Sequence, residues 1–364
     1  MIAAGGTGGH IYPGVALADA LKRKEPAATI SFVGTMKGLE KTLIPDAGYR
    51  LDFIDVKPFQ RELSLAPLAA GLSLLRATGQ ARRLIAGADA VAGMGGYPTL
   101  PTIAAARWSR IPSVIHESGA TAGLANRVAA RFTPNIALAF PEAAAGFPRR
   151  AEPKVVGMPL REDVATFDRS RLRALARSEY GIPEGTVAVL VMGGSLGALT
   201  LNRVALELAE RWRDRDDVRI ILKAGRDHFD SARAALEASG GIRVATPYGF
   251  IDQIGTAYAA ADLALVRAGA GTVAELPVVG LPAVLIPYPH APGDHQTLNA
   301  QPLMKAGAGV IIADHEANAD RIGPVIEELL ADPERLHAMS RAATTLARPH
   351  AADELADWML ELAA

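Results

Sequence analysis

The residues just before His10 form a loop built almost entirely of glycine, and such a loop is suited to binding an anion. Four of the five residues 5–9 are glycine, and the apolar run 15–18 that follows is typical of a helix. Glycines let a backbone turn without Cβ clashes and expose several N–H groups at a helix N-terminus. The segment therefore predicts an anion cradle at the N-terminus of a helix.

The same loop argues against a dinucleotide cofactor. A dinucleotide-binding turn has the pattern Gly-x-Gly-x-x-Gly, and counting from Gly6 places Ile11 where the third glycine belongs. The expected strand 29–33 is followed by Gly34 and Thr35, so no acidic residue stands ready to bind a ribose. We therefore expect this loop to bind phosphate, and we disfavour a nucleotide-dependent dehydrogenase.

A carboxylate with a possible binding role follows a second set of small residues, in the segment 267–276. Small residues at the start of a helix let a diphosphate approach the N–H groups and the positive end of the helix dipole. Glu275 lies one turn further on, where its carboxylate can accept two hydrogen bonds from a vicinal diol such as ribose. The alternative is an acidic side chain that only stabilises the helix N-terminus.

Other polar residues allow competing interpretations. Glu117 ends an expected strand, with Asn126 near it in the sequence. The loop 287–299 is rich in side chains that can read sugar hydroxyls, although His290, Asp294 and His295 lack the further regularly spaced ligands of a metal site. We therefore expect no metal and no other cofactor. The run 211–219, which mixes positive and negative side chains, predicts a solvated loop.

The elements that position these residues alternate between short β-rich runs and longer helical patterns, which predicts parallel α/β layers. Further glycine turns, 93–98 and 193–198, follow apolar runs, and turns at the carboxyl ends of strands indicate one shared crevice. The expected strands are 29–33, 51–55, 90–94, 113–116, 136–139, 154–156, 187–192, 219–224, 242–245, 263–266, 283–286 and 309–312. The expected helices include 168–179, 200–213, 229–238 and 321–330. The repeat of strand, glycine turn and helix at mid-chain predicts two Rossmann-like halves.

Composition excludes several classes of protein. The chain has 364 residues, of which 49% are hydrophobic, with a formal net charge of −1 and no cysteine. These values fit two globular domains, give no general attraction to nucleic acid, and exclude disulfides and cysteine nucleophiles. No signal peptide and no apolar run of about 20 residues is apparent. We expect a cytoplasmic protein, and leave open a peripheral association with the inner face of the cell membrane.

The order and spacing of five segments, 5–14, 93–97, 193–198, 267–275 and 294–300, resemble the signatures of the MurG family of glycosyltransferases, within family 28. The resemblance runs from about residue 2 to the C-terminus. It implies an α/β protein of the GT-B fold, with two Rossmann-like domains facing across a cleft. The domains would be 1–157, joined by a C-terminal helix 349–364, and 158–348. It further implies inverting transfer of N-acetylglucosamine from UDP-N-acetylglucosamine to the 4-hydroxyl of the muramyl sugar of a polyprenyl-diphosphate acceptor.

The resemblance also implies roles for individual residues. His10 would be the base, because an imidazole with a pKa near ~6.5 can accept a proton at neutral pH. The alternative is a histidine that only orders the loop, with Glu117 as the competing base. The donor site would contain Arg161, Ser195, Ile251, Ala270, Gly271, Thr272, Glu275 and Gln296. The acceptor site would contain Thr7, Gly8, Gly9, Gly95, Gly96, Tyr97 and Asn126. The partners are thus a UDP-sugar and a polyprenyl-diphosphate-linked acceptor, with no nucleic acid. The segment 63–85, with leucines and Arg76, Arg82 and Arg83, would offer a membrane-facing patch; a core-facing amphipathic helix is the alternative.

The chain departs from the family pattern at several positions. Ser118 and Gly119 stand where an amide-bearing pair is expected, Leu196 replaces a glutamine, Gly271 replaces a larger apolar residue, Pro277 interrupts a helix, and Met158 replaces an asparagine. Together these differences leave open a related transferase with a secondary-metabolite acceptor. A UDP-N-acetylglucosamine 2-epimerase and a non-catalytic lipid-diphosphate-binding module are further alternatives.

Overall fold

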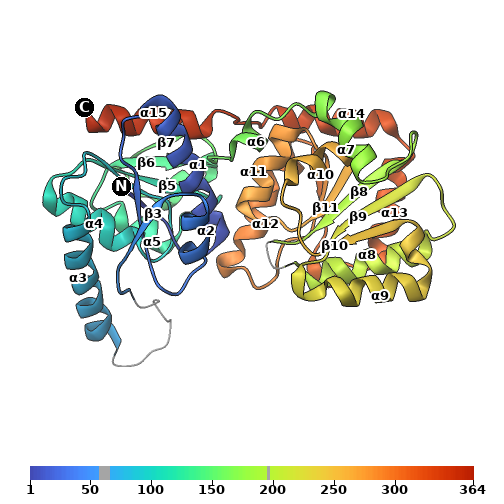
Figure 1. Cartoon of the computed structure of the whole chain (residues 1–364), viewed down its shortest axis with the longest axis horizontal. Helices are drawn as coiled ribbons and strands as arrows, with labels where there is room; N and C mark the ends of the chain where they lie inside the picture. The colour runs from blue at the N-terminus through green and yellow to red at the C-terminus, as the bar shows by residue number, and fades with distance from the viewer. Residues whose placement is uncertain (57–65, 195–196) are drawn as a thin grey trace. The chain divides into compact units, whose positions relative to one another are not determined.

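The chain forms two compact units in the computed structural model, which describes residues 1–56, 66–194 and 197–364. The first unit joins Met1–Arg161 to Arg348–Ala364, and the second is Glu162–Ala347. The sequence interpretation divided the chain after residue 157, four residues before this boundary. Each unit has its own parallel sheet, as Figure 1 shows.

The first unit is built on a seven-stranded parallel sheet of order β3-β2-β1-β4-β5-β6-β7. Its strands are β1 (Ile2–Ala3), β2 (Ser31–Gly34), β3 (Arg50–Phe53), β4 (Val91–Gly93), β5 (Ser113–Glu117), β6 (Asn135–Leu138) and β7 (Glu152–Val155). Strand order reverses beside β1, and ligands of open α/β sheets bind at the carboxyl ends of strands at such a point. Although β1 has two residues, both of its neighbours pair with it.

Helices cover the first sheet, and the last helix of the chain is one of them. They are α1 (Gly8–Lys24), α2 (Glu40–Asp46), α3 (Ala66–Leu84), α4 (Thr99–Ser109), α5 (Leu124–Ala129) and α15 (Ala351–Ala363). Leu355, Ala356 and Met359 of α15 are buried in the same apolar cluster as Leu17 and Leu21 of α1. Figure 1 shows α15 and α1 side by side. The C-terminal helix therefore completes the core of the first unit.

The second unit is built on a six-stranded parallel sheet of order β10-β9-β8-β11-β12-β13. Its strands are β8 (Val187–Met192), β9 (Val218–Lys223), β10 (Ala245–Tyr248), β11 (Leu263–Val266), β12 (Ala283–Leu285) and β13 (Gly309–Ile311). Its helices are α6 (Glu162–Ala165), α7 (Arg169–Glu179), α8 (Leu199–Arg211), α9 (Phe229–Ser239), α10 (Ile254–Ala260), α11 (Ala270–Val279), α12 (His295–Lys305), α13 (Ala319–Leu330) and α14 (Pro333–Thr344). The apolar run of β8 suits a strand covered on both faces.

One expected strand is wrong in its position. Residues 242–245 were expected to be extended, but Gly241–Arg243 forms a 3-10 turn and the strand begins at Ala245. Gly240 ends α9 in the left-handed conformation, with φ of 76°, and the chain needs the following turn before it can pair with β9. Pro247 lies within β10, which is tolerated because β10 is an edge strand.

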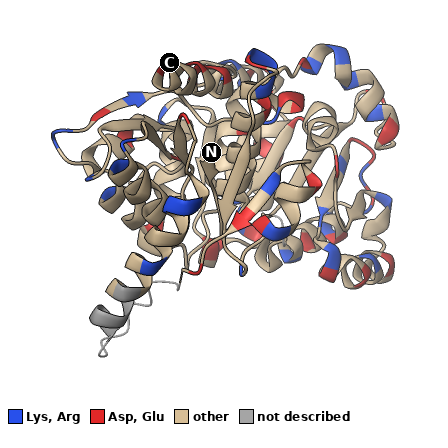
Figure 2. Ribbon diagram, turned by 60° about the vertical axis from the view of Figure 1, so that its left-hand side comes forward, with Lys and Arg blue, Asp and Glu red and all other residues tan. Residues whose placement is uncertain are grey.

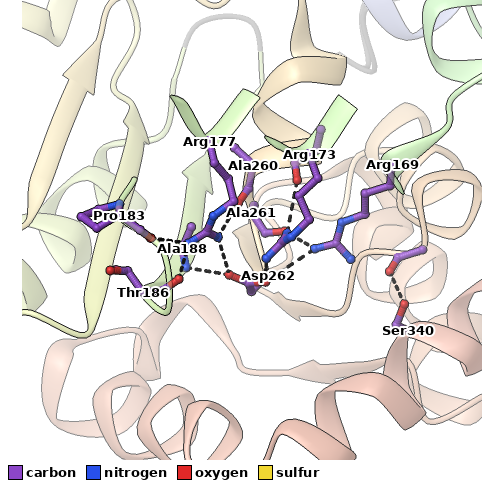
Figure 3. Close-up of polar contacts among 12 residues, drawn as sticks. Arg169, Arg173, Arg177, Pro183, Thr186, Ala188, Ala260, Ala261, Asp262 and Ser340 are labelled. Carbon is purple, nitrogen blue, oxygen red and sulfur yellow. Dashed lines mark hydrogen bonds and ion pairs between the residues drawn. The ribbon is translucent and has the colours of Figure 1, made fainter. Parts of the chain in front are cut away.

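Three arginines fix α7 to the rest of the second unit. Arg169, Arg173 and Arg177 are spaced four residues apart on one face of α7, and all three converge on Asp262 (Figure 3). The same guanidinium groups donate to the carbonyls that end α10, such as Ala259 O and Ala260 O. Cations at a helix C-terminus interact favourably with the helix dipole. This cluster stabilises the second unit at the ends of β11 and α10.

Candidate functional site

Two glycine turns of the first unit pack directly against each other and against His10. A Cβ on Gly96 would lie 2.2 Å from Gly5 O, and a Cβ on Gly95 would lie 2.5 Å from His10 Cδ2. Both glycines also have positive φ, 105° for Gly95 and 80° for Gly96. Other residues would clash at these positions. The expected proximity of the turns 5–9 and 93–98 is therefore present in the structure.

His10 is the third residue of α1 and is half-buried. Its Nδ1 lies 3.2 Å from Gly5 O. Because a carbonyl only accepts, this contact keeps a proton on Nδ1 and makes Nε2 the basic nitrogen of the neutral ring. The orientation of the imidazole is thus set by the loop that precedes it, as a general base requires.

The other expected acceptor-site residues of these turns surround the start of α1. Thr7 is the exposed N-cap residue, and its carbonyl accepts from His10 N over 3.1 Å. Gly8 and Gly9 form the first turn of the helix. Tyr97 is exposed on the second turn, directly before Pro98. These groups could contact one ligand at the carboxyl ends of β1 and β4.

Glu117 is held by its own loop. The side chain is buried, and Oε1 accepts a hydrogen bond from Gly119 N over 3.1 Å. Its Oε2 accepts from Gly123 N and from Asn126 Nδ2, each over 2.9 Å. The carboxylate therefore fixes the loop between β5 and α5. Ser118 and Gly119, which depart from the family pattern, lie in this loop. Gly119 donates its backbone N–H to Glu117, an interaction that does not depend on its side chain.

Asn126 is likewise a buried side chain with partners in the protein. Besides Glu117, its Nδ2 donates to His116 O over 3.1 Å. The Oδ1 atom of Asn126 is buried and has no hydrogen-bond partner in the part of the chain that the structure describes. Asn126 thus ties α5 to the end of β5, and its amide oxygen remains available to a donor.

His116, which the sequence interpretation did not single out, is fully enclosed. Its Nε2 lies 2.9 Å from Gly157 O. Desolvation lowers the pKa of His116 to about 4, against a smaller opposite effect of the Gly157 carbonyl. The ring is therefore neutral at pH 7 and links β5 to Gly157, four residues before the unit boundary.

The third glycine turn, which follows β8, also leaves no space for a side chain at one of its glycines. A Cβ on Gly197 would lie 2.3 Å from Ala224 O, and Gly197 has a φ of 83°. Ser195, expected to contact phosphate, lies outside the described residues together with Leu196. The turn brings Gly194 beside the end of β9.

Helix α11 follows β11, which is the neighbour of β8 in the second sheet. It begins at Ala270 with Gly269 as the N-cap, so Ala270, Gly271 and Thr272 form its first three residues. A Cβ on Gly271 would meet no atom within 4 Å, so the absence of a side chain leaves open space there. The helix ends at Val279, two residues after Pro277. The three small residues are thus where a helix N-terminus can receive an anion.

Glu275 is oriented by a buried tyrosine. The Tyr258 hydroxyl donates to Glu275 Oε2 over 2.6 Å, and Tyr258 has no exposed surface. The carboxylate itself is half-buried. Tyr258 lies in α10. It was not identified from the sequence, because a tyrosine on an apolar helix face suggests only core packing. The bond gives the expected ribose-binding carboxylate a fixed position.

Basic and aromatic side chains gather at the ends of β9 and β10. Lys223 Nζ lies 5.6 Å from the Phe250 ring centroid, and the Arg226 guanidinium carbon lies 4.8 Å from it. Phe250 is exposed, whereas the next residue, Ile251, is buried. Ile251, whose backbone was expected to contact uracil, therefore comes directly after the exposed ring of Phe250. The sequence interpretation missed both cations, although Lys223 ends an expected strand at the edge where ligands bind.

Gln296 is engaged by its own loop. Its Oε1 accepts from Tyr288 N over 2.9 Å, which holds the side chain against the loop that precedes it. In the same loop His295 Nδ1 lies 3.0 Å from Pro292 O, and Asp294 Oδ1 accepts from Thr297 Oγ1 over 2.7 Å. The loop that was expected to read sugar hydroxyls is thus ordered by local side-chain bonds.

Arg161 is the last residue of the first unit before the chain enters the second, and its side chain is half-buried. Its expected contribution to the donor site would come from the other unit, so this role stays a prediction.

The expected membrane-facing segment is only partly described. In α3, Leu75 is 60% exposed, and Arg76, Arg82 and Arg83 are exposed as well. Figure 2 shows basic positions along this helix. Leu65, Leu68 and Leu72, which belong to the expected patch, have side chains outside the described part of the chain. Among the described residues, no helix is long and apolar enough to cross a membrane.

Comparison with known proteins gives consistent matches to both halves. The model of the glycosyltransferase family 28 N-terminal domain matches residues 1–138, and that of the family 28 C-terminal domain matches residues 188–355. The curated UDP-N-acetylglucosamine--N-acetylmuramyl-(pentapeptide) pyrophosphoryl-undecaprenol N-acetylglucosamine transferase of Clavibacter sepedonicus is 40% identical over 98% of this chain and 94% of its own. The protein of the same name from Acidothermus cellulolyticus is 41% identical over 100% and 98%.

Solved structures agree with this result. The crystal structure of Acinetobacter baumannii MurG is similar with a TM-score of 0.80 and 31% identity, covering 99% of this chain and 98% of that one. A putative UDP-N-acetylglucosamine 2-epimerase from Listeria monocytogenes has a TM-score of 0.66 at 15% identity, with coverage of 97% and 94%. At that identity the likeness concerns the fold alone.

Proposed function

The chain belongs to glycosyltransferase family 28 and has the GT-B fold, and from this premise we propose that it transfers N-acetylglucosamine from UDP-N-acetylglucosamine to a polyprenyl-diphosphate-linked muramyl sugar. The observation that carries the proposal is the full-length similarity to transferases named for this reaction. The first unit would bind the acceptor at its two glycine turns. The second would bind the UDP-sugar at the third turn and at α11.

The reaction we infer is a single inverting displacement. The 4-hydroxyl oxygen of the acceptor forms a bond to the anomeric carbon of the donor, and the bond from that carbon to the diphosphate oxygen breaks. The hydroxyl proton passes to a base, and UDP leaves with the bonding electrons. We assign the base to His10 Nε2, supported by the contact of Nδ1 with Gly5 O that fixes the tautomer. The N-terminus of α11 would stabilise the charge on the departing diphosphate.

Glu117 suits this role less well than His10. Its two carboxylate oxygens accept hydrogen bonds from Gly119 N and Gly123 N of the loop and from Asn126 Nδ2 of α5. A base that takes a proton in the reaction would have to give up part of this network. We therefore propose that Glu117 maintains the shape of the acceptor side, together with Asn126.

The donor side is expected to use no metal ion. We propose that the dipole of α11 and nearby basic side chains replace one. Turnover that is unchanged by EDTA would agree with this proposal, and recovery of activity only on addition of Mg²⁺ or Mn²⁺ would contradict it. Peripheral membrane binding also belongs to the proposal, because a polyprenyl acceptor resides in a bilayer; the exposed arginines of α3 support it.

The experiment that tests the function follows UDP release from UDP-N-acetylglucosamine with a short-chain lipid I analogue. We expect UDP to appear only when the acceptor is present. UDP release without acceptor would indicate an epimerase, and UDP binding without turnover on any acceptor would indicate a binding module. His10→Ala should reduce kcat by about two to four orders of magnitude. His350→Ala, which changes an exposed histidine of the same unit, is the matched control.

A further inference from the structure

Lys223 occupies a position where a lysine side chain is seldom buried. It is the last residue of β9, at the carboxyl edge of the second sheet, and only 8% of its surface is exposed. In the register of the sheet it is paired with Met192, directly before the third glycine turn. A lysine is rarely this buried unless it has a charged partner.

The partners of its ammonium group within the protein are weak. Nζ donates to Gly194 O over 3.4 Å and lies 5.6 Å from the Phe250 ring centroid. Among the residues described, none places a carboxylate within ion-pair distance of it. An ammonium can donate three hydrogen bonds, so most of this capacity is unused by the described part of the chain.

The electrostatic interactions of the Lys223 ammonium involve a residue of the expected donor site. Desolvation lowers the pKa of Lys223, and the negative charge of Glu275 opposes this effect. Lys223 thus lies within electrostatic reach of α11 while it contacts the glycine turn after β8. Arg226 adds a second positive charge against the same Phe250 ring.

We propose that Lys223 binds the diphosphate of the UDP-sugar, between Gly194 and the first turn of α11. A diphosphate there supplies the anion that the buried ammonium lacks, and the ammonium neutralises charge that grows as UDP leaves. This inference rests on the proposed function, since that function supplies the nucleotide. It adds a basic side chain of the second unit to the small residues of α11 that are expected to receive the diphosphate.

A competing explanation is that Lys223 only holds the glycine turn through Gly194 O. Two substitutions separate these roles. Lys223→Gln keeps a donor for the Gly194 carbonyl and removes the charge, whereas Lys223→Met removes both. Lys305→Met is the matched control, because Lys305 is exposed at the end of α12 in the same unit.

The test is the binding of uridine and of UDP to each purified variant, by isothermal titration calorimetry, with melting temperature as the check on folding. We expect both Lys223 variants to bind UDP about 10- to 100-fold more weakly, the loss typical of a charge-assisted hydrogen bond. Uridine affinity should stay within about twofold of the wild type, and Lys305→Met should match the wild type with both ligands.

Three results would overturn the inference. Wild-type UDP affinity in Lys223→Gln would show that the charge does not bind diphosphate. Equal losses for uridine and UDP would assign Lys223 to the shape of the turn. Both results leave the proposed function intact, because the wild type binds UDP in each. A wild-type protein that binds neither ligand would instead refute the proposed function itself, and this inference with it.

Discussion

Glu117→Gln distinguishes a loop anchor from a catalytic base. The substitution keeps the size of the side chain, but its amide group has one accepting oxygen in place of two. The two carboxylate oxygens of Glu117 accept from Gly119 N, Gly123 N and Asn126 Nδ2. In the variant an NH₂ group must face at least one of these donors. The loop between β5 and α5 should therefore open more often.

The size of the effect follows from the hydrogen bonds lost. A hydrogen bond to a charged group contributes about 1.5–3 kcal/mol. Losing one such contribution raises the population of the open loop by about 10- to 100-fold. Hydrogen–deuterium exchange at the amides of Gly119 and Gly123 should accelerate by that factor. Glu142→Gln, at an exposed glutamate of the same unit, should leave these amides unchanged.

Turnover measured on the same variants completes the test. If Glu117 anchors the loop, kcat of Glu117→Gln should fall with the loss of loop protection, and the pH profile should keep its wild-type shape. If the amides stay protected as in the wild type while kcat drops by about 100-fold or more, Glu117 is the base and the anchoring argument is refuted.

Three further perturbations have expected outcomes. Asp262→Asn should lower the free energy of unfolding, measured by urea titration, by about 1–3 kcal/mol, because three arginines lose their shared negative charge. An unchanged urea midpoint would show that the cluster contributes little to stability. Tyr258→Phe should raise KM for UDP-N-acetylglucosamine about 10-fold with kcat within about twofold, since Glu275 loses its 2.6 Å hydrogen bond; a changed kcat at constant KM would oppose this assignment. The folded pKa of His116 lies near 4 and the unfolded value near ~6.5, so the unfolded chain binds more protons between these values. Stability should thus fall by up to about 3 kcal/mol as the pH drops through this window, an effect that His116→Gln should remove and His350→Gln should retain.

The alternation of strands and helices was predictable because parallel α/β sheets have a simple pattern. Buried strands such as β8 and β11 are uninterrupted apolar runs, and their expected bounds agree with the structure. The strand expected at 242–245 was misplaced because Gly240 has a left-handed conformation that apolar content does not reveal. Edges and turns depend on backbone geometry more than on side-chain type.

The candidate site was predictable where glycine spacing marked it. The contact between Gly96 and Gly5 O follows from two glycine turns at neighbouring strands. Tyr258 and Lys223 could not be assigned in the same way, because their importance depends on which atoms the fold brings to them. A buried hydroxyl that orients a carboxylate looks like an ordinary core residue in the sequence.

The return of α15 to the first unit sets an order in which the protein can be completed during synthesis. The core beside α1 needs Leu355 and Met359, so it stays open until these two residues have left the ribosome. The second unit, residues 162–347, has all of its strands before that point. Folding of the inserted unit can therefore precede closure of the unit that surrounds it. A chain truncated after residue 347 and released from the ribosome should resist protease within residues 162–347, while residues 1–161 remain sensitive.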